Sequence, residues 1–241
     1  MNQSKTIVII LAAGKGTRMN SDIPKVMHKI NNKSMLNIII EKSEKLNPEK
    51  IIVVVGYKKE LIIDSVENSD VVFVNQNKQL GTADAIKQCI GALEGFNGNI
   101  LILSGDVPLI KYKTLNNFIL FHHNHNSTAS LISTEIENPQ GYGRVIRNNN
   151  GQIVSIVEHK DASIEQLEIN EINSGIYIFN SKFLTKKIIL IKNDNIQKEY
   201  YLPDIFNFTD TENKYIYKIN DNVEISGVNT IKQLKQIEKL F

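Results

Sequence analysis

The chain has 241 residues, enough for one large α/β domain or two small ones, and its 41% hydrophobic and 22% charged residues argue against disorder and coiled coils. The 28 Lys and Arg against 26 Asp and Glu leave a formal net charge of +2, and the basic residues are scattered, which argues against a protein that binds nucleic acid or an anionic membrane. The apolar stretch at residues 6–13 is too short to span a membrane and lacks the features of a signal peptide. We therefore expect a cytoplasmic protein.

The first half of the chain alternates between β-branched runs and segments of helical periodicity. Buried strands are predicted at residues 6–12, 51–55, 71–74 and 100–104, and helices at 34–46, 58–66, 82–93 and 111–123, the third capped by Thr82. Strand-helix alternation at this spacing favours a mainly parallel sheet with right-handed crossovers.

The pattern changes after Ser127. Strand-like segments occur at residues 128–134, 143–146, 153–158, 172–179 and 215–219, and helical segments at 181–191 and 230–240. They predict a β-rich, antiparallel or mixed extension of the same sheet. Since no Gly-, Ser- or Pro-rich linker and no repeat interrupts the chain, residues 1–241 are predicted to form a single Rossmann-like α/β domain with helices on both faces of a mixed, mainly parallel sheet.

Two side-chain groups that resemble reactive sites have simpler interpretations. The single cysteine, Cys89, excludes an internal disulfide and a cysteine-built zinc site, and its apolar surroundings predict a buried, inert thiol. His122, His123 and His125 contain no pair at i and i+4 on the predicted helix, so they are expected to be solvated histidines rather than a metal cluster.

A glycine-rich loop at residues 11–19, L-A-A-G-K-G-T-R-M, follows the first strand directly, which is where ligands bind in an α/β sheet. Gly14 and Gly16 remove Cβ atoms, so the backbone can turn tightly and present N–H groups to anionic oxygens. The loop is neither a Walker A motif nor the dinucleotide fingerprint, and the two glycines alone would also fit an ordinary turn. Arg18 and Lys25 add two cations, which favours a triphosphate site.

The loop and the P-K-V-M-H segment at residues 24–28 resemble the signature of nucleotidyltransferases that act on sugar 1-phosphates, in particular the N-acetylglucosamine-1-phosphate uridylyltransferase branch. Further matches follow in order: Gln76 with L-G-T-A at 80–83, G-D-V-P-L at 105–109, G-Y-G-R at 141–144, I-V-E at 156–158, E-I-N-S-G-I at 171–176, E-Y-Y-L at 199–202 and G-V-N at 227–229. Each match is weak alone, and the ordered set is specific. The resemblance implies the fold of the nucleotide-diphospho-sugar transferases.

The resemblance also implies roles for individual residues. Those expected to bind the nucleotide are Leu11, Ala12, Ala13, Gly14, Gly16, Lys25, Gln76, Gly81 and Thr82. Lys25 and Arg18 are the expected catalytic residues, with Lys25 at the α-phosphate and Arg18 at the departing β- and γ-phosphates. Gln76 offers a donor and an acceptor side by side, which suits the edge of uracil.

Asp106 and Asn229 are the expected ligands of a Mg²⁺ ion. Asp106 ends a buried strand within a Gly-Asp-x-Pro turn, where a carboxylate could also be a turn former. Asn229 supplies a second oxygen, although it could also cap the terminal helix. One carboxylate and one amide leave the remaining Mg²⁺ positions to water and phosphate.

The sugar-binding residues rest on the resemblance alone. They are Gly141, Glu158 and Asn173, with Glu199 and Tyr201 expected in the acetamido pocket. Ser104 stands where the family often has an aromatic residue, and Pro203 where a threonine is usual; both departures concern the sugar rather than the reaction.

The implied reaction joins UTP and N-acetylglucosamine 1-phosphate to give pyrophosphate and UDP-N-acetylglucosamine, a precursor of cell walls and lipopolysaccharide. Alternatives are a thymidylyl- or cytidylyltransferase, an enzyme for another sugar such as glucose 1-phosphate, and a non-catalytic sugar-nucleotide-binding module. Relatives usually continue into a trimerising acetyltransferase domain built as a left-handed β-helix. The sequence contains no such hexapeptide run, so no acetyl transfer and a monomer or weak oligomer are expected.

Overall fold

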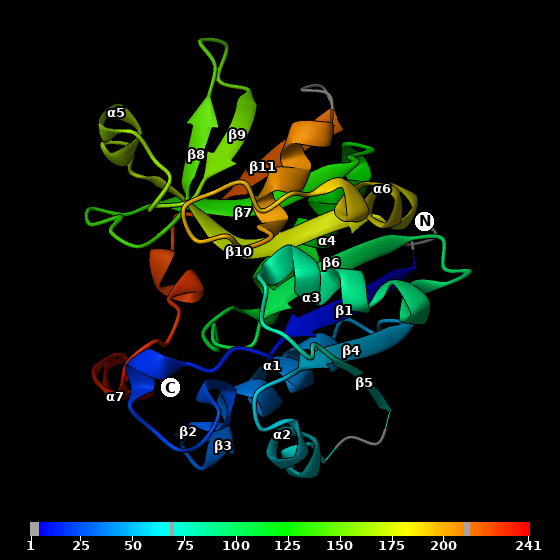
Figure 1. Cartoon of the computed structure of the whole chain (residues 1–241), viewed down its shortest axis with the longest axis vertical. Coiled ribbons are helices and arrows are strands. Elements are labelled where there is room, and N and C mark those ends of the chain that lie inside the picture. The colour runs from blue at the N-terminus through cyan, green and yellow to red at the C-terminus, as the bar shows by residue number, and fades with distance from the viewer. Residues whose placement is uncertain (1–4, 68–69, 210–212) are drawn as a thin grey trace.

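The computed structural model describes residues 5–67, 70–209 and 213–241. The strands of its main sheet are β1 (Thr6–Leu11), β4 (Lys50–Val55), β5 (Val71–Asn75), β6 (Asn99–Ser104), β7 (Ala129–Glu135), β8 (Arg144–Arg147), β9 (Ile153–Val157), β10 (Glu171–Asn180) and β11 (Lys214–Lys218). Within the described residues they form one nine-stranded sheet in the order β11-β7-β10-β6-β1-β4-β5, with β8 paired with β10 and β9 paired with β8 (Figure 1). The pairs among β1, β4, β5 and β6 are parallel, and those of β10 with β6, β7 and β8 are antiparallel.

Both faces of the sheet are covered, as the continuous apolar run of β1 predicts. Ile7 and Ile9 face one hydrophobic core, whereas Val8 and Ile10, which point the other way, face a second core. The helices are α1 (Met35–Glu44), α2 (Lys59–Ser65), α3 (Thr82–Gln88), α4 (Tyr112–Asn124), α5 (Ile164–Leu167), α6 (Ser181–Lys187) and α7 (Ile231–Glu238). Helices α3 and α6 contribute to the first core, and α1 and α4 to the second. None of the helices in the described ranges has the length and apolar character to cross a membrane.

Five predicted helices are shorter in the structure than the periodicity indicated, among them those at 34–46 and 58–66, which span Met35–Glu44 and Lys59–Ser65. Helix α3 ends at Gln88 and is followed by a 3₁₀ turn at Ile90–Leu93, and α6 ends at Lys187 before a 3₁₀ turn at Ile188–Leu190. The tighter turns keep the apolar spacing nearly unchanged, so the sequence pattern does not separate them from α-helix. The terminal helix spans Ile231–Glu238 instead of residues 230–240.

The short antiparallel pair of β2 (Lys29–Ile30) and β3 (Lys33–Ser34) was not predicted, and neither was α5. All three elements contain only two to four residues, too few to show a period. They lie in segments that the sequence indicated only as connections between longer elements.

His122 is buried, which corrects the prediction of a solvated histidine. The residue is 2% exposed, and its Nδ1 atom lies 2.9 Å from Ser130 Oγ. Burial, assisted by the nearby His123, lowers the pKa of His122 to about 4, so the ring is neutral near pH 7. Cys89 is fully buried and burial raises the pKa of its thiol to about 12, which confirms the inert cysteine.

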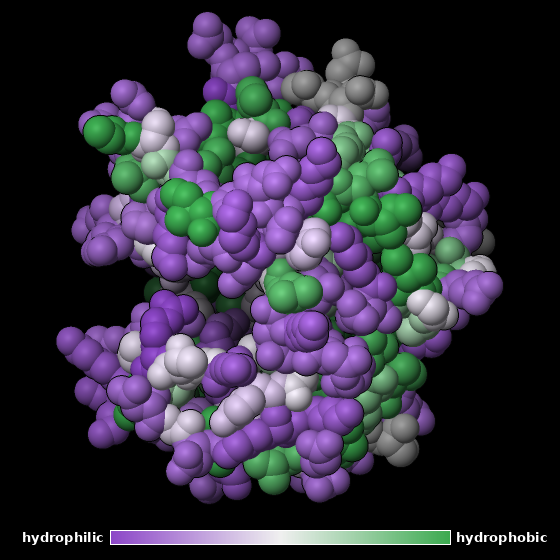
Figure 2. Space-filling model, viewed as in Figure 1, coloured by the Kyte–Doolittle hydropathy of each residue, from purple (hydrophilic) through white to green (hydrophobic). Residues whose placement is uncertain are grey.

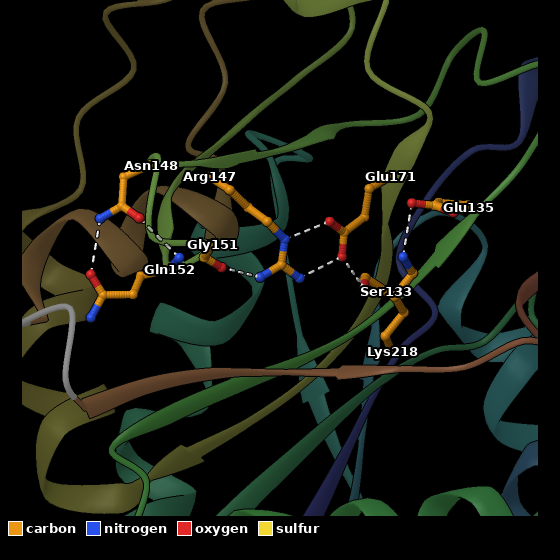
Figure 3. Close-up of polar contacts among 8 residues, drawn as sticks. All are labelled: Ser133, Glu135, Arg147, Asn148, Gly151, Gln152, Glu171 and Lys218. Carbon is orange, nitrogen blue, oxygen red and sulfur yellow. Dashed lines mark hydrogen bonds and ion pairs between the residues drawn. The ribbon is translucent and has the colours of Figure 1, made fainter.

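An ion pair ties the β-rich half of the sheet together (Figure 3). The Arg147 guanidinium on β8 donates two hydrogen bonds of 2.7 Å to the Glu171 carboxylate on β10, and Ser133 on β7 donates a third at 2.6 Å. Burial alone would raise the pKa of Glu171, but these hydrogen bonds outweigh it and hold the pKa below its ordinary value. Three strands are thereby fixed beside the segment that carries Asn173.

Candidate active site

The carboxyl ends of the parallel strands lie together at one edge of the sheet, because Leu11 is in register with Val54 on one side and Ser104 on the other. A pocket of about 320 Å³ opens at this edge. Its lining residues are Leu11, Ala13, Gly14, Lys25, Gln76, Gln79, Gly81, Thr82, Ala85, Ser104, Asp106 and Glu199. Figure 2 shows that the molecule is hollowed at the left of the view, between its β-rich part and the part that carries α7, β2 and β3 in Figure 1.

The glycine-rich loop holds Lys25 through the packing of Gly16. Gly16 has a left-handed φ of 62°, and a Cβ placed on it would lie 2.5 Å from Lys25 Cβ. Only glycine therefore allows the loop and Lys25 to approach so closely. Gly14 differs, because a Cβ there would meet no atom within 4 Å. The space beside Gly14 belongs to the pocket, where the backbone is open to a ligand.

Lys25 joins three segments that are far apart in the sequence. Its ammonium contacts the Asp106 carboxylate, just beyond β6, and donates to Asn229 Oδ1 at 3.1 Å. Arg18 donates to the same Asn229 oxygen at 2.8 Å. Two cations and two oxygen groups thus meet at one point, although Asn229 lies 211 residues from Arg18.

The arrangement at Asn229 also settles the capping question raised by the sequence. Thr230 is the N-cap of α7 and accepts the N–H of Gln233, so Asn229 does not cap the helix. The Asn229 N–H donates to Gln233 Oε1 at 2.8 Å, which fixes the backbone and leaves the side chain at Lys25.

The turn at Gly81 and Thr82 is fixed against the segment that follows Glu199. Gly81 has φ 116°, and a Cβ on it would lie 2.5 Å from the Tyr200 carbonyl oxygen. The predicted cap by Thr82 is wrong, because Gly81 is the N-cap and Thr82 is the first residue of α3. The Thr82 hydroxyl instead accepts the Leu202 N–H at 2.9 Å, which joins this turn to the 199–202 segment.

Glu158 and Tyr201 line a second pocket, of about 590 Å³, together with Asp161 and Asp204. Burial, followed by the negative charges of Asp204, Asp161 and Glu199, raises the pKa of Glu158 to about 7. Burial, followed by Asp161, raises the pKa of Asp204 to about 6. The pocket is therefore rich in carboxyl groups, and those of Glu158 and Asp204 become protonated at higher pH than ordinary carboxyl groups.

Replacing Glu158 with glutamine is expected to stabilise the protein at pH 8 and to have little effect at pH 4. The pKa of Glu158 rises from 4.5 to about 7 on folding, so the folded state binds more protons between these values and wild-type stability falls as pH rises through 7. The glutamine side chain cannot ionise, and the expected gain at pH 8 is about 2–3 kcal/mol.

Urea unfolding of both proteins at the two pH values measures this difference. The exposed Glu168→Gln is the matched control, and it should follow the wild type at both pH values. If Glu158→Gln and wild type are equally stable at pH 8, the carboxyl group is not buried as described.

Asn173 and Gly141, both expected to bind the sugar, are not among the residues that line either pocket. Asn173 is 7% exposed, and its amide accepts the Gly175 N–H at 3.1 Å and donates to the Tyr177 hydroxyl at 2.6 Å. Gly141 has a left-handed φ of 83° in the loop before β8.

The structure brings together most of the predicted nucleotide residues but separates the two expected in the acetamido pocket. Glu199 lines the pocket beside Lys25, whereas Tyr201 lines the second pocket. Ala12, at the start of the loop, is 2% exposed and does not line the pocket. Gln79 and Ala85 were not predicted to line the site, and the only signal for Gln79 was its place in the loop between Gln76 and Gly81.

Comparison with known proteins decides the family. Residues 7–223 match the family described as nucleotidyl transferase. The chain belongs to this family. The glycine-rich loop, Lys25 and Asp106 all lie within the matched region of this nucleotidyl transferase, which confirms the family expected from the motifs.

The nucleotidyl transferase is similar to proteins named "Bifunctional protein GlmU". It is 42% identical over 241 residues to that of Geotalea daltonii, covering 99% of this chain and 53% of the relative. It is also 42% identical over 235 residues to that of Streptococcus gordonii, covering 97% of this chain and 51% of the relative. The chain thus spans about half the length of these curated relatives.

Solved structures with the same fold confirm the predicted α/β architecture. UDP-glucose pyrophosphorylase in complex with UDP-glucose superposes with a TM-score of 0.77 at 18% identity, covering 98% of each chain. HddC from Yersinia pseudotuberculosis, complexed with GMP-PN, gives a TM-score of 0.69 at 25% identity, covering 98% of this chain and 99% of HddC. A mixed, mainly parallel sheet flanked by helices is therefore the fold of this nucleotidyl transferase.

Proposed function

We propose that the chain transfers uridylyl from UTP to N-acetylglucosamine 1-phosphate, with release of pyrophosphate, as a single nucleotidyltransferase domain. The observation that supports it most is the meeting of Lys25, Arg18, Asp106 and Asn229 beside the glycine-rich loop. Such a group of cations and oxygens suits a triphosphate better than a neutral ligand. The motif order and the 42% identity to GlmU proteins favour this branch over other sugar nucleotidyltransferases.

Positioning and charge neutralisation provide most of the rate enhancement in this mechanism. The sugar phosphate is already an anionic nucleophile, so no general base is needed for its attack on the α-phosphorus. Lys25 stabilises negative charge at the α-phosphate, and Arg18 at the departing β- and γ-phosphates. The backbone beside Gly14 leaves room for the phosphate chain.

Asp106 and Asn229 are the residues that would hold Mg²⁺. Their oxygens both contact the Lys25 ammonium and so converge on a cation, and carboxylate and amide oxygens are hard ligands of the kind Mg²⁺ prefers. Among the described residues, no cluster of three or more His, Cys, Asp or Glu side chains is arranged to hold a metal, so water and phosphate would complete the coordination. When bound, Mg²⁺ would supply Lewis-acid neutralisation of phosphate charge.

Glu158 and Tyr201 support sugar binding in the second pocket rather than in the pocket beside Lys25. Both line the carboxyl-rich pocket, where hydrogen-bond acceptors are available for sugar hydroxyls. The cytoplasmic location and the monomeric or weakly oligomeric state stay predictions.

Pyrophosphate release tests the function directly. The protein is incubated with UTP and either N-acetylglucosamine 1-phosphate or glucose 1-phosphate, with and without Mg²⁺. We expect Mg²⁺-dependent release that is at least about tenfold faster with the N-acetylated sugar, since missing sugar contacts typically cost about 1–3 kcal/mol. Faster turnover of glucose 1-phosphate would show that glucose 1-phosphate, not its N-acetylated counterpart, is the preferred substrate. The absence of release with every sugar and triphosphate would favour a binding module.

A further inference from the structure

The side-chain amide of Gln76 is locked in one orientation at the entrance to α3. Gln76 is 4% exposed and follows β5 directly. Its Nε2 atom donates to the Gly81 carbonyl oxygen at 3.1 Å and to Asp84 Oδ2 at 2.8 Å. Both hydrogens of the amide are therefore used within the protein.

The orientation follows from the chemistry of the two partners. A backbone carbonyl and a carboxylate only accept hydrogen bonds, so the nitrogen of Gln76 must face them. The reversed amide would place Oε1 against two other oxygens, which is strongly unfavourable. The sequence alone indicated a donor and an acceptor for the base, whereas in the structure the oxygen is the group left to a ligand.

The backbone next to Gln76 supplies the opposite polarity. The N–H groups of Gly81 and Thr82 donate to no acceptor within the described part of the chain, and both residues line the same pocket as Gln76. The pocket therefore offers one acceptor with donors beside it. Uracil and thymine present a donor, N3–H, next to an acceptor, O4. Cytosine presents an acceptor at N3 and a donor at N4, which is the reversed pattern.

We propose that Asp84 is a specificity-determining residue, which turns the Gln76 amide so that its oxygen faces the base and the pocket selects uracil or thymine over cytosine. Asp84 does not line the pocket and acts through Gln76. This inference rests on the proposed function, because it assumes that the pocket beside Lys25 receives the nucleotide base.

The neighbours of Asp84 provide a matched control. Its second oxygen, Oδ1, accepts a hydrogen bond of 3.3 Å from Nε2 of the exposed Gln88, which makes no hydrogen bond to Gln76 within the described residues. Gln88→Ala removes that contact and leaves the bond to Gln76 intact. Asp84→Asn keeps an acceptor oxygen of the same shape, whereas Asp84→Ala removes it.

The test compares kcat/KM for UTP with kcat/KM for CTP in the four proteins. The wild type should prefer UTP, and Asp84→Ala should lower that preference about tenfold or more, as expected for loss of a hydrogen bond to a charged group. Asp84→Asn and Gln88→Ala should keep most of the preference. A structural role alone would lower the rates with both triphosphates equally and leave their ratio unchanged. An unchanged ratio in Asp84→Ala, or in Asp84→Leu if the alanine variant does not fold, would overturn the proposal.

Calorimetric titration of UTP and CTP without sugar phosphate separates this inference from the proposed function. If the wild type binds UTP more tightly and Asp84→Ala loses the difference, the role of Asp84 stands even where no product is formed. Equal affinity of the wild type for UTP and CTP would overturn the role of Asp84 even if uridylyl transfer is observed.

Discussion

Lys25→Met is expected to lower kcat about 100- to 1,000-fold, the range seen when one donor to a developing charge is removed. Lys25 contacts both Asp106 and Asn229, and its side chain is largely shielded from water, with 17% exposed. Low exposure strengthens its interaction with a phosphate oxygen. Methionine keeps the aliphatic stem that packs on Gly16 and removes only the charge.

Single-turnover measurements with UTP and the sugar phosphate check this prediction. Nucleotide affinity should fall less than kcat, because Arg18 and the loop backbone remain. Lys29→Met, four residues further on and exposed, is the matched loss of charge and should behave as wild type. Since Lys25→Met leaves Asp106 without its cation, the thermal midpoint is measured alongside. Turnover within a factor of two of wild type would remove Lys25 from the mechanism.

Gly81→Ala is expected to destabilise the protein by about 3 kcal/mol and to lower Tm by about 10 °C. The φ of 116° is strained for any residue with a Cβ, and that Cβ would lie 2.5 Å from the Tyr200 carbonyl oxygen and 2.7 Å from its nitrogen. Both obstacles are backbone atoms, so a side-chain rotation cannot relieve the contact. The turn and the 199–202 segment would have to separate, which also disturbs Gln76.

Gly14→Ala is the matched control, because its Cβ would meet no protein atom within 4 Å. Its stability should stay within about 0.5 kcal/mol of wild type. Its kcat/KM for UTP should nevertheless fall about tenfold or more, which corresponds to a loss of at least about 1.4 kcal/mol of phosphate contact. Equal Tm values for Gly81→Ala and wild type would show that the turn is not held against Tyr200.

Much of the fold was predictable because local patterns report burial. The apolar run of β1 indicated a strand covered on both faces, and Ile7, Ile9, Val8 and Ile10 divide between two cores as that pattern requires. The loop that follows β1 was predicted to bind phosphate from its glycines and cations. Lengths of helices were less predictable, since 3₁₀ turns after α3 and α6 preserve the apolar spacing.

The sequence by itself determined the strand-helix alternation, the glycine-rich loop and the family, since all three depend on the order and spacing of neighbouring residues. Only the tertiary structure decided which distant side chains meet. It set Asn229 beside Arg18, buried His122, and separated Tyr201 from Glu199. It also turned the Gln76 amide toward Asp84. The physical reason is that burial and hydrogen-bond partners depend on how the strands and the segments that connect them are arranged in space. Sequence periodicity reports only which face of an element is apolar, not which distant residue will lie against it.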